Sequence, residues 1–471
     1  MEDNTFPKLL KRNYHKYGNA KVAMRKKEKG IWKRCTWEDF YLHAKRISLG
    51  LLSFGLKPGE AVMLVGDNCP EFYWVELAVH CANATSVMVF PENEASKIKD
   101  IINDMGATFA VVQDQELVDK FKEMREEVPT IRKLIYWEVQ GSMLHEDPWL
   151  LSLDELEEIG REYEDEHPGL FEQNIARNDA NDICIVSYTS NSIGSNMGVM
   201  VTYGNLLKTM SEFLTVEPWY SNDEYFSFMP VASFWEQNLG VAGSLLRGTT
   251  VNFPERADTV QRDIREISPH ILQCPSAIWQ EFAGSVRTRI MDSHFLSRTL
   301  FNLLIPSRIK IGQLKATSQK SGIFDRVLWA IADVTLFKPL LNKLGLVRNR
   351  VAYTDGQSMD NEVFDFLRAL GINIKHLFGT TETQINTVHR TGDVRSETLG
   401  MAIPGCAVKI LKGEMLLKGV EPFEGYFKGG KKRGDALNRV SADGWFHTGQ
   451  YGFTTKKNHI ARIGEVARKN G

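Results

Sequence analysis

The pattern of apolar and polar residues in the first third of the chain predicts alternating helices and strands. Between residues 39 and 54, apolar residues recur at spacings of four and three, at Phe40, Ala44, Ile47, Leu51 and Phe54. This spacing predicts one face of an amphipathic helix. Short unbroken apolar runs predict buried strands at 61–65, 85–90, 109–112 and 132–137, with helices at 71–83 and 94–105. Strands and helices that alternate through short loops indicate a parallel sheet covered by helices.

The pattern continues after a strongly acidic segment at 154–166, which we interpret as a solvated helix face or a linker. We expect a new sheet to begin at Ile183, with further strands at 226–229, 249–253, 270–273, 350–354 and 374–378. From about Arg390 the pattern changes to short strands with Gly and Pro turns. That change predicts a small β-rich subdomain.

The segment 279–346 is predicted to be mainly helical. It combines many Leu, Ile and Phe residues with the basic residues Arg287, Arg289, Arg298, Arg308, Lys310, Lys315, Lys320 and Arg326. One interpretation is a set of core helices with basic side chains at their rims. The other is a surface that makes peripheral contact with a membrane.

Length and composition limit the classes of function. A chain of 471 residues predicts two or three packed subdomains. The formal net charge of −2 gives no general basic field, so nucleic acid is not an expected partner. Six scattered cysteines and a charged N-terminus unlike a secretory leader predict a reducing cytoplasmic compartment. No membrane-spanning helix is expected, because no apolar run is long enough. The sequence leaves the oligomeric state open.

The stretch YTSNSIGSNMGVM at 188–200 is the first candidate for chemistry. It follows an apolar run and precedes TYGNLL at 202–207, so a buried strand, a small-residue loop and a helix start follow one another. This order is typical of a phosphate-binding loop. Thr189 and Ser190 offer hydroxyls, while Gly194 and Gly198 allow a turn and a close backbone approach. The loop contains no Lys or Arg that would balance phosphate charge.

Several segments in order make the chain resemble the adenylate-forming enzymes, and among them the AMP-forming long-chain acyl-CoA synthetases. LLSFGLKPGEAVMLVGDNCPEF at 51–72 is similar to the family's first sheet, and the stretch 188–207 is similar to YTSGTTGxPKGVMxTHxNLL. FMPVASFWEQ at 228–237 resembles xLPLAHxxEQ, AYTDGQSM at 352–359 resembles the adenine-holding SGGAPL, and LFGTTETQ at 377–384 resembles YGxTE. GEMLLKG, EGYF and GWFHTGQYG follow in the family's order.

The resemblance implies an α/β fold, the N-terminal domain of an adenylate-forming enzyme. That domain has two α/β sheet subdomains flanked by helices, plus a small distorted β-barrel. We expect it to span 1–463, with subdomains at about 1–180, 181–350 and 351–463, the first two interleaved. In the family, ATP and a carboxylic acid give an acyl adenylate, and the thiol of coenzyme A then displaces AMP. The implied ligands are ATP or AMP, Mg²⁺, coenzyme A and a fatty acid or other acyl substrate.

The resemblance also assigns site residues. Glu382 matches the Mg²⁺-linked carboxylate and, with Thr381, is the expected catalytic residue. Nucleotide-binding positions carried over are Thr189, Ser190, Ser192, Gly194, Gly198, Gly356, Gly379, Thr380, Gln450 and Arg462. Arg462 corresponds to the arginine that meets the ribose. The acyl groove is expected near 234–237 and 378–381. A purely structural role is the alternative for most of these residues, and inheritance without function is the alternative for Glu382.

Substitutions at the nucleotide positions weaken the implied site. In the loop, Asn191 replaces a glycine and Met197 replaces the lysine; Asp355 replaces a glycine of the adenine segment. Gln450 stands where the family's HTGD motif has its ribose-binding Asp, and a neutral amide is a weaker acceptor than a carboxylate. Hydrogen bonds to charged groups contribute roughly 1.5–3 kcal/mol each. Losing two or three costs on the order of 4 kcal/mol, about a thousandfold in ATP affinity.

Two classes of function follow. The first is an AMP-dependent long-chain fatty acid–CoA ligase-like enzyme with impaired adenylation. The second is a catalytically inactive pseudoenzyme that acts as an acyl-binding, scaffold or peripheral membrane module. We expect 464–471 to be a remnant of the family's hinge and the small C-terminal domain, which supplies an adenylation lysine in the family, to be absent, either from the protein itself or only from this sequence. The expected location is the cytoplasm, with peripheral membrane contact in the second case.

Overall fold

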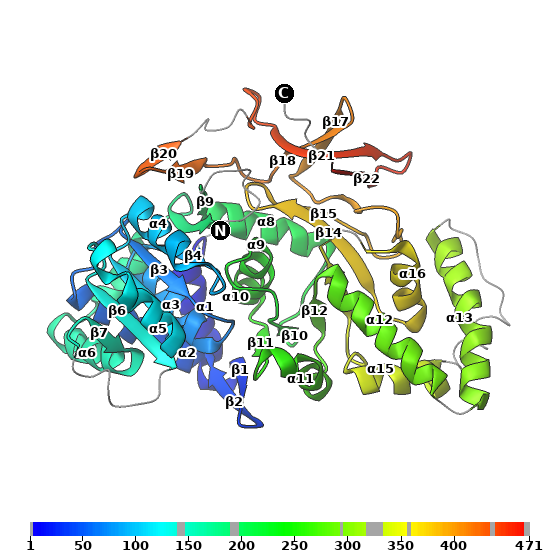
Figure 1. The fold of residues 1–471 in the computed structure, drawn as a ribbon, viewed down its shortest axis with the longest axis horizontal. Helices are drawn as coiled ribbons and strands as arrows, with labels where there is room; N and C mark the ends of the chain where they lie inside the picture. The colour runs from blue at the N-terminus through cyan, green and yellow to red at the C-terminus, as the bar shows by residue number, and fades with distance from the viewer. Residues whose placement is uncertain are drawn as a thin grey trace.

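Two nine-stranded sheets and one four-stranded sheet form the framework of the protein (Figure 1). The computed structural model describes residues 3–138, 147–188, 197–292, 295–316, 333–355, 359–433 and 439–465. In Figure 1, the first sheet lies mainly in the blue and cyan part, the second in the green and yellow part, and the small C-terminal sheet in the orange and red part. The expected α/β fold is confirmed, and the small sheet is a curled half-barrel.

The first large sheet has the strand order β20-β19-β9-β8-β4-β3-β5-β6-β7. Its central strands are buried along their whole length because they are unbroken apolar runs, as is typical of parallel strands covered on both faces. The strands are β3 (Ala61–Val65), β4 (Thr85–Val89), β5 (Phe109–Asp114), β6 (Lys133–Glu138), β7 (Leu150–Ser152), β8 (Ile183–Tyr188), β9 (Gly198–Thr202), β19 (Tyr426–Lys428) and β20 (Lys431–Arg433). The helices of this part are α1 (Phe6–Tyr17), α2 (Trp37–Ser53), α3 (Pro70–Cys81), α4 (Ala95–Met105), α5 (Gln115–Glu123), α6 (Leu153–Glu166) and α7 (Leu170–Arg177).

The strand that begins at Ile183 corrects one expectation. It does not start a new sheet, because β8 pairs in parallel with β4 and so belongs to the first sheet. Its neighbour β9 then turns back and pairs with β8 in antiparallel fashion. An apolar run predicts a buried strand but not its partner, and here the partner lies about a hundred residues earlier in the chain.

The second large sheet has the order β16-β15-β14-β13-β12-β10-β11-β1-β2. Its edge comes from the N-terminus, since β1 pairs in parallel with β11. The strands are β1 (Val22–Glu28), β2 (Ile31–Thr36), β10 (Glu224–Phe226), β11 (Thr250–Phe253), β12 (Ile271–Gln273), β13 (Val351–Thr354), β14 (Ile374–Thr380), β15 (Gln384–Val388) and β16 (Met401–Ala402). The helices here are α8 (Tyr203–Val216), α9 (Phe234–Glu236), the π-helix η4 (Gln237–Gly243), α10 (Ser244–Arg247), α11 (Val260–Ile267), α12 (Ser276–Met291), α13 (Phe295–Ala316), the π-helix η6 (Asp333–Phe337), α15 (Lys338–Leu344) and α16 (Asn361–Leu370).

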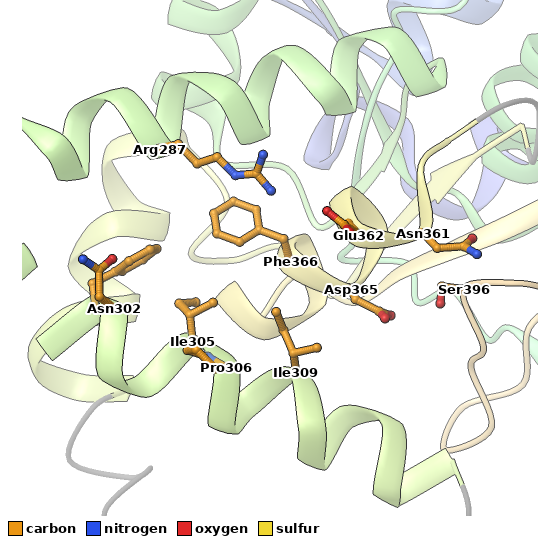
Figure 2. Close-up of a pocket in the computed structure, with 11 residues that line it drawn as sticks. Arg287, Asn302, Ile305, Pro306, Ile309, Asn361, Glu362, Asp365, Phe366 and Ser396 are labelled. Carbon is orange, nitrogen blue, oxygen red and sulfur yellow. The ribbon is translucent and has the colours of Figure 1, made fainter. Parts of the chain in front are cut away.

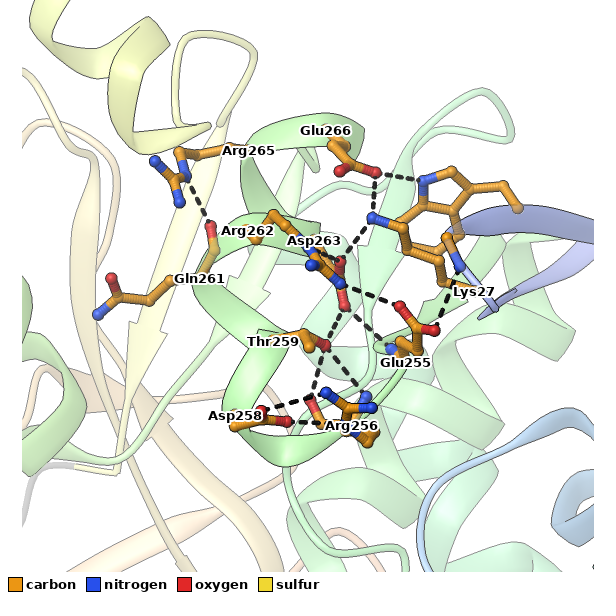
Figure 3. Close-up of polar contacts among 12 residues, drawn as sticks. Lys27, Glu255, Arg256, Asp258, Thr259, Gln261, Arg262, Asp263, Arg265 and Glu266 are labelled. Carbon is orange, nitrogen blue, oxygen red and sulfur yellow. Dashed lines mark hydrogen bonds and ion pairs between the residues drawn. The ribbon is translucent and has the colours of Figure 1, made fainter.

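A buried ion pair joins this N-terminal edge of the sheet to helix α11 (Figure 3). Lys27 on β1 places its Nζ 3.0 Å from Asp263 Oδ1 on α11, and the two side chains are 3% and 0% exposed. Burial alone would raise the pKa of Asp263. Donation from Thr259 Oγ1, Glu255 N and Lys27 lowers it below its ordinary value, so the carboxylate is ionised. Glu266 completes the cluster with a 2.6 Å contact to Lys27 Nζ.

The acidic segment is a helix with a solvated face, one of the two expected alternatives, and not a linker. It forms α6, which packs closely against α2. A Cβ atom on Gly160 would lie 1.8 Å from the Arg46 carbonyl oxygen and 2.8 Å from the Gly50 nitrogen, so only glycine permits this contact. Leu153 and Leu156 are buried on the same face. Most of the acidic side chains therefore lie on the exposed face of a helix whose inner face is part of the core, while Glu157 and Glu164 pair with His43 and Lys45 of α2.

The C-terminal sheet has the order β17-β18-β21-β22, with β17 (Ala407–Leu411), β18 (Glu414–Lys418), β21 (Phe446–Thr454) and β22 (Ile460–Glu465). A small apolar cluster joins it to the end of β14 through Phe378, Met415, Leu417 and Ile460. The expected β-rich subdomain is thus present and rests on the second sheet. Among the described helices, none has both the length and the apolar character needed to cross a bilayer.

Candidate nucleotide and acyl site

Glu382 lies in the tight turn that joins β14 to β15. The turn needs glycine at position 379, because a Cβ atom there would lie 2.0 Å from the Gln384 carbonyl oxygen. Gln384 itself has φ +59°, a left-handed conformation that is uncommon for residues other than glycine. Such conformations persist where surrounding contacts enforce them, and they are frequent at functional sites. The LFGTTETQ motif therefore builds a strained turn.

The threonines of the motif stabilise this turn. The Thr380 hydroxyl lies 2.9 Å from the Thr383 hydroxyl and accepts from the Thr383 backbone N–H at 3.2 Å. Thr381 is 7% exposed, and its carbonyl accepts a hydrogen bond from Gln384 Nε2 at 2.5 Å. The structure thus gives both predicted site residues, Thr380 and Thr381, contacts within the turn.

The π-helix η4 also holds the β14–β15 turn in place. Gln384 Oε1 accepts a hydrogen bond from Asn238 Nδ2 at 2.7 Å, and Asn238 lies in the π-helix η4 that follows FMPVASFWEQ. π-helical segments are frequent at functional sites. This bond joins residues that directly follow or lie close to the two segments, 234–237 and 378–381, expected to form the acyl groove. Gln384 and Asn238 are residues that motif matching alone did not single out.

The carboxylate of Glu382 is held by a tyrosine from the first sheet. Glu382 Oε1 accepts a hydrogen bond of 2.9 Å from the Tyr426 hydroxyl, and burial together with this carboxylate raises the pKa of Tyr426. Tyr426 lies on β19 opposite Val199 of β9, and Phe427 lies opposite Gly198. A Cβ atom on Gly198 would lie 2.3 Å from Val186 Cγ1. Tyr426 therefore links Glu382 to the β9–β19 strand pair, in which Gly198 lies opposite the next residue, Phe427.

The loop that precedes Gly198 differs from the expected layout. A second strand, β9, separates it from the helix, so the N-terminus of α8 at Tyr203 lies at the far end of β9 from the loop. Met197, at the position of the family's loop lysine, is 3% exposed and belongs to the main core. The predicted residues Thr189, Ser190, Ser192, Gly194 and Gly356 lie outside the described residues.

The two expected ribose contacts lie on neighbouring strands of the C-terminal sheet. Gln450 on β21 pairs with Glu465 of β22, while Arg462 pairs with Gly452. The Arg462 side chain lies outside the described part of the structure. Gln450 Oε1 is buried and accepts no hydrogen bond from any described residue. A buried acceptor without a donor fits a ligand hydroxyl, although more weakly than the carboxylate of an Asp would.

Two carboxyl groups are fully buried here: Glu236, which belongs to the FMPVASFWEQ segment, and Glu76 on α3. Glu236 Oε1 accepts hydrogen bonds from Tyr73 at 2.7 Å and Ser227 at 2.6 Å, and Oε2 accepts one from Tyr225 at 2.8 Å. Burial raises the pKa of Glu236 to about 7 and the pKa of Glu76 to about 8. Strongly shifted carboxyl groups are common near functional sites. The sequence feature that could have indicated Glu236 was its position within an otherwise apolar stretch.

These features together define the N-terminal domain of an adenylate-forming enzyme: two large α/β sheets, a curled C-terminal sheet and a carboxylate held at the turn between β14 and β15. The sequence profile of the AMP-binding enzyme family matches residues 10–427, and the chain belongs to that family.

Comparison with known proteins is consistent with this assignment. The chain is 21% identical to the long-chain-fatty-acid–CoA ligase ACSBG2 of Xenopus laevis over 98% of its own length and 63% of that protein. The fold is similar to that of a long-chain-fatty-acid–CoA ligase from Archaeoglobus fulgidus, with a TM-score of 0.73, 17% identity, and coverage of 98% of this chain and 84% of that one. It is also similar to the anthranilate CoA ligase AuaEII in complex with anthranoyl-AMP, with a TM-score of 0.71, 15% identity, and coverage of 98% and 78%. The chain therefore spans less than two thirds of the curated relative's length.

Proposed function

We propose that the chain is the nucleotide- and acyl-binding part of an AMP-forming long-chain fatty acid–CoA ligase, which binds ATP weakly and forms acyl adenylates slowly. The observation that carries this proposal is the geometry around Glu382. Its carboxylate is oriented by Tyr426, and its turn is fixed to the π-helix through Gln384. A half-buried carboxylate held in one orientation suits a metal–phosphate contact better than a mobile surface residue would.

Glu382 fits a Mg²⁺ ion that is bound by one protein carboxylate together with the phosphates of the nucleotide. Among the described residues, no group of three His, Cys, Asp or Glu side chains could hold a metal ion. Mg²⁺ in nucleotide sites is often bound by one or two carboxylates together with the phosphates of the substrate, so a single carboxylate is sufficient. Mg²⁺, when bound, would neutralise phosphate charge, and the chain's own contribution is to hold Glu382 in place. Gln450 would accept a ribose hydroxyl.

Two observations support weak ATP binding. Met197 is packed in the core at the position where the family has a lysine, so no ammonium group is available there. Gln450 is neutral, so its contact with a ribose hydroxyl lacks the charge assistance of an Asp. We therefore expect this chain to bind ATP about a thousandfold more weakly than a site that keeps the charged contacts.

Pyrophosphate release with ATP, Mg²⁺ and a series of fatty acids tests this proposal. We expect slow release above the blank, abolished by Glu382→Gln. Release that is absent at millimolar ATP, with no ATP-dependent rise in melting temperature, would instead establish the pseudoenzyme alternative. The substitution Arg256→Gln serves as a control because Arg256 lies on an exposed surface with Asp258.

A specific observation also favours the peripheral membrane role. On α13, Phe295, Leu300 and Leu303 are 70%, 51% and 70% exposed, and residues 295–316 contain basic but no acidic side chains. An exposed apolar face with basic neighbours suits an anionic lipid surface. We expect co-sedimentation with vesicles that contain phosphatidylserine, weakened by Leu303→Glu. Equal sedimentation of this variant and the unaltered chain would remove this role.

A further inference from the structure

A buried polar network joins the start of β22 to the second sheet. Its three histidines are His376 on β14, His389 on β15 and His459, which immediately precedes β22, and all three are buried. Thr398 lies between two of them, with its Oγ1 3.0 Å from His389 Nε2 and 3.0 Å from His459 Nδ1. On its other side, His459 places Nε2 3.1 Å from Asp393 Oδ2. None of the motifs that identify the family includes these five residues, so the proposed function does not yet explain the network.

The backbone makes the same junction. The Leu399 N–H donates to the Ile460 carbonyl at 2.7 Å, and the Ile460 N–H donates to the Gly400 carbonyl at 2.8 Å. The Leu399 carbonyl in turn accepts a hydrogen bond of 2.7 Å from Thr387 Oγ1 on β15. Segment 390–400 therefore lies between β15 and the first residue of β22, and whatever holds this segment also holds the strand.

The hydrogen positions in the network follow from its acceptors. His389 Nδ1 accepts the backbone N–H of His376 at 3.1 Å, and burial lowers the pKa of His389 well below its ordinary value. His389 is therefore neutral, and its Nε2 carries a hydrogen that it donates to Thr398. Thr398 Oγ1 donates its own hydrogen to the Arg395 carbonyl at 3.2 Å. A hydroxyl has one hydrogen and two lone pairs, so its contact with His459 requires a hydrogen on His459 Nδ1.

Asp393 requires a hydrogen on the other ring nitrogen of His459. Burial alone would raise the pKa of Asp393, but Arg395 and His459 lower it below its ordinary value, so the carboxylate is ionised and can only accept. With hydrogens on both nitrogens, His459 is an imidazolium ion beside Asp393. Removing the Nδ1 proton would leave Thr398 with one hydrogen for two acceptors and would remove the positive charge from the pair. Histidine is the side chain that ordinarily changes charge near neutral pH.

The charges around the network make this pair depend on one residue. The titratable and charged side chains that act on it are Asp393 and Arg395 of segment 390–400, His389 of β15, His376 and Lys375 of β14, and Arg368 of α16. Segment 390–400 also passes α16, where its Ser396 lines a cavity together with Asn361 (Figure 2). Asp393 is the one carboxylate in this set, so it is the group that favours the imidazolium form.

We infer that His459 is a positioning residue for the nucleotide, and that its protonated form fixes the start of β22 against the second sheet. Arg462, the expected ribose contact, is the third residue of β22, and its backbone pairs with Gly452 of β21, the strand that carries Gln450. A shift at the start of β22 would therefore displace the strand that carries Arg462. The inference rests on the proposed function, because it concerns how the nucleotide site is held.

Hydrogen exchange tests the junction in the full chain without nucleotide. After correction for intrinsic exchange rates, and relative to the amides of β3, we expect amides 460–463 to be at least tenfold better protected at pH 6 than at pH 8.5. Asp393→Asn keeps the shape but removes the charge, and it should reduce this ratio to less than twofold. Thr398→Val should lower the ratio at least threefold, whereas Thr398→Ser, which keeps the hydroxyl, should retain it. His167→Gln is the control, because His167 is exposed at the end of α6, and it should leave the ratio unchanged.

Calorimetric titration with Mg·ATP tests the positioning role. The dissociation constant should be at least threefold higher at pH 8.5 than at pH 6, judged against the same ratio in Asp393→Asn because ATP itself titrates. A protection ratio below threefold in the unaltered chain, or one that Asp393→Asn leaves unchanged, would overturn the inference. The expected protection ratio with equal pH effects on ATP affinity in both proteins would overturn the positioning role. ATP binding to neither protein, with the expected protection ratio, would instead contradict the proposed ligase function and support the junction.

Discussion

The ion pair between Lys27 and Asp263 allows a quantitative prediction about the N-terminal edge of the second sheet. Replacing Asp263 with Asn leaves the Lys27 ammonium, 3% exposed, without its buried anion. Breaking a buried pair on one side costs about 3–5 kcal/mol. Glu266 remains 2.6 Å from Lys27 Nζ but is 41% exposed, so it compensates only in part. We therefore expect the lower end of that range, about 3 kcal/mol.

Hydrogen exchange of the β1–β2 backbone amides measures this effect locally. Since about 1.4 kcal/mol corresponds to a factor of ten, Asp263→Asn should lower protection in residues 22–36 about a hundredfold. Asp258→Asn is the control, because the Arg256–Asp258 pair is 68% and 70% exposed, and it should change nothing measurable. The double variant Lys27→Met with Asp263→Asn removes the unpaired ammonium as well and should regain part of the protection. Less than a threefold change in Asp263→Asn would refute the reasoning.

Three further predictions concern the site. Gly379→Ala should lower stability by about 1–3 kcal/mol, because its Cβ atom would lie 2.0 Å from the Gln384 carbonyl oxygen. Gly284 has open space around it, so Gly284→Ala should not lower stability, and the melting temperatures of the two variants test this. Glu236 has a pKa raised to about 7, so its stabilising contribution is complete below about pH 4.5 and disappears as the pH rises through 7. Glu236→Gln should therefore gain up to about 3 kcal/mol relative to the unaltered chain between pH 5 and 9, and a difference independent of pH would contradict this. Tyr426→Phe keeps the buried ring but removes its hydroxyl from Glu382, so Mg²⁺-dependent ATP binding measured by calorimetry should weaken severalfold; unchanged affinity would show that Tyr426 does not position the carboxylate.

Local elements were predictable from the sequence because they depend on neighbouring residues. The strand expected at 61–65 is β3 with the same bounds, and the helix expected at 39–54 is α2. Pairing across long distances in the chain was not predictable. No local feature of Ile183–Tyr188 shows that β4 is its partner, and none indicates that the acidic α6 uses Gly160 to approach α2.

The candidate site was likewise predictable from the sequence only in part. Motif order identified the segment around Glu382, but the residues that orient it come from elsewhere. Tyr426 reaches Glu382 from β19, and Asn238 reaches the turn from a π-helix. Gln384 adopts a left-handed conformation that its side chain does not favour, so propensity could not have indicated it. Such contacts arise from tertiary packing, which a single sequence does not display.

The affinity of the chain for Mg·ATP tests the central claim most directly. Calorimetric titration of the chain and of its Glu382→Gln variant should give a dissociation constant near the millimolar range for the former and no binding for the latter. That range is about a thousandfold above the micromolar values of tight nucleotide sites, as the missing charged contacts require. A micromolar constant, or a millimolar one that Glu382→Gln leaves unchanged, would contradict the account.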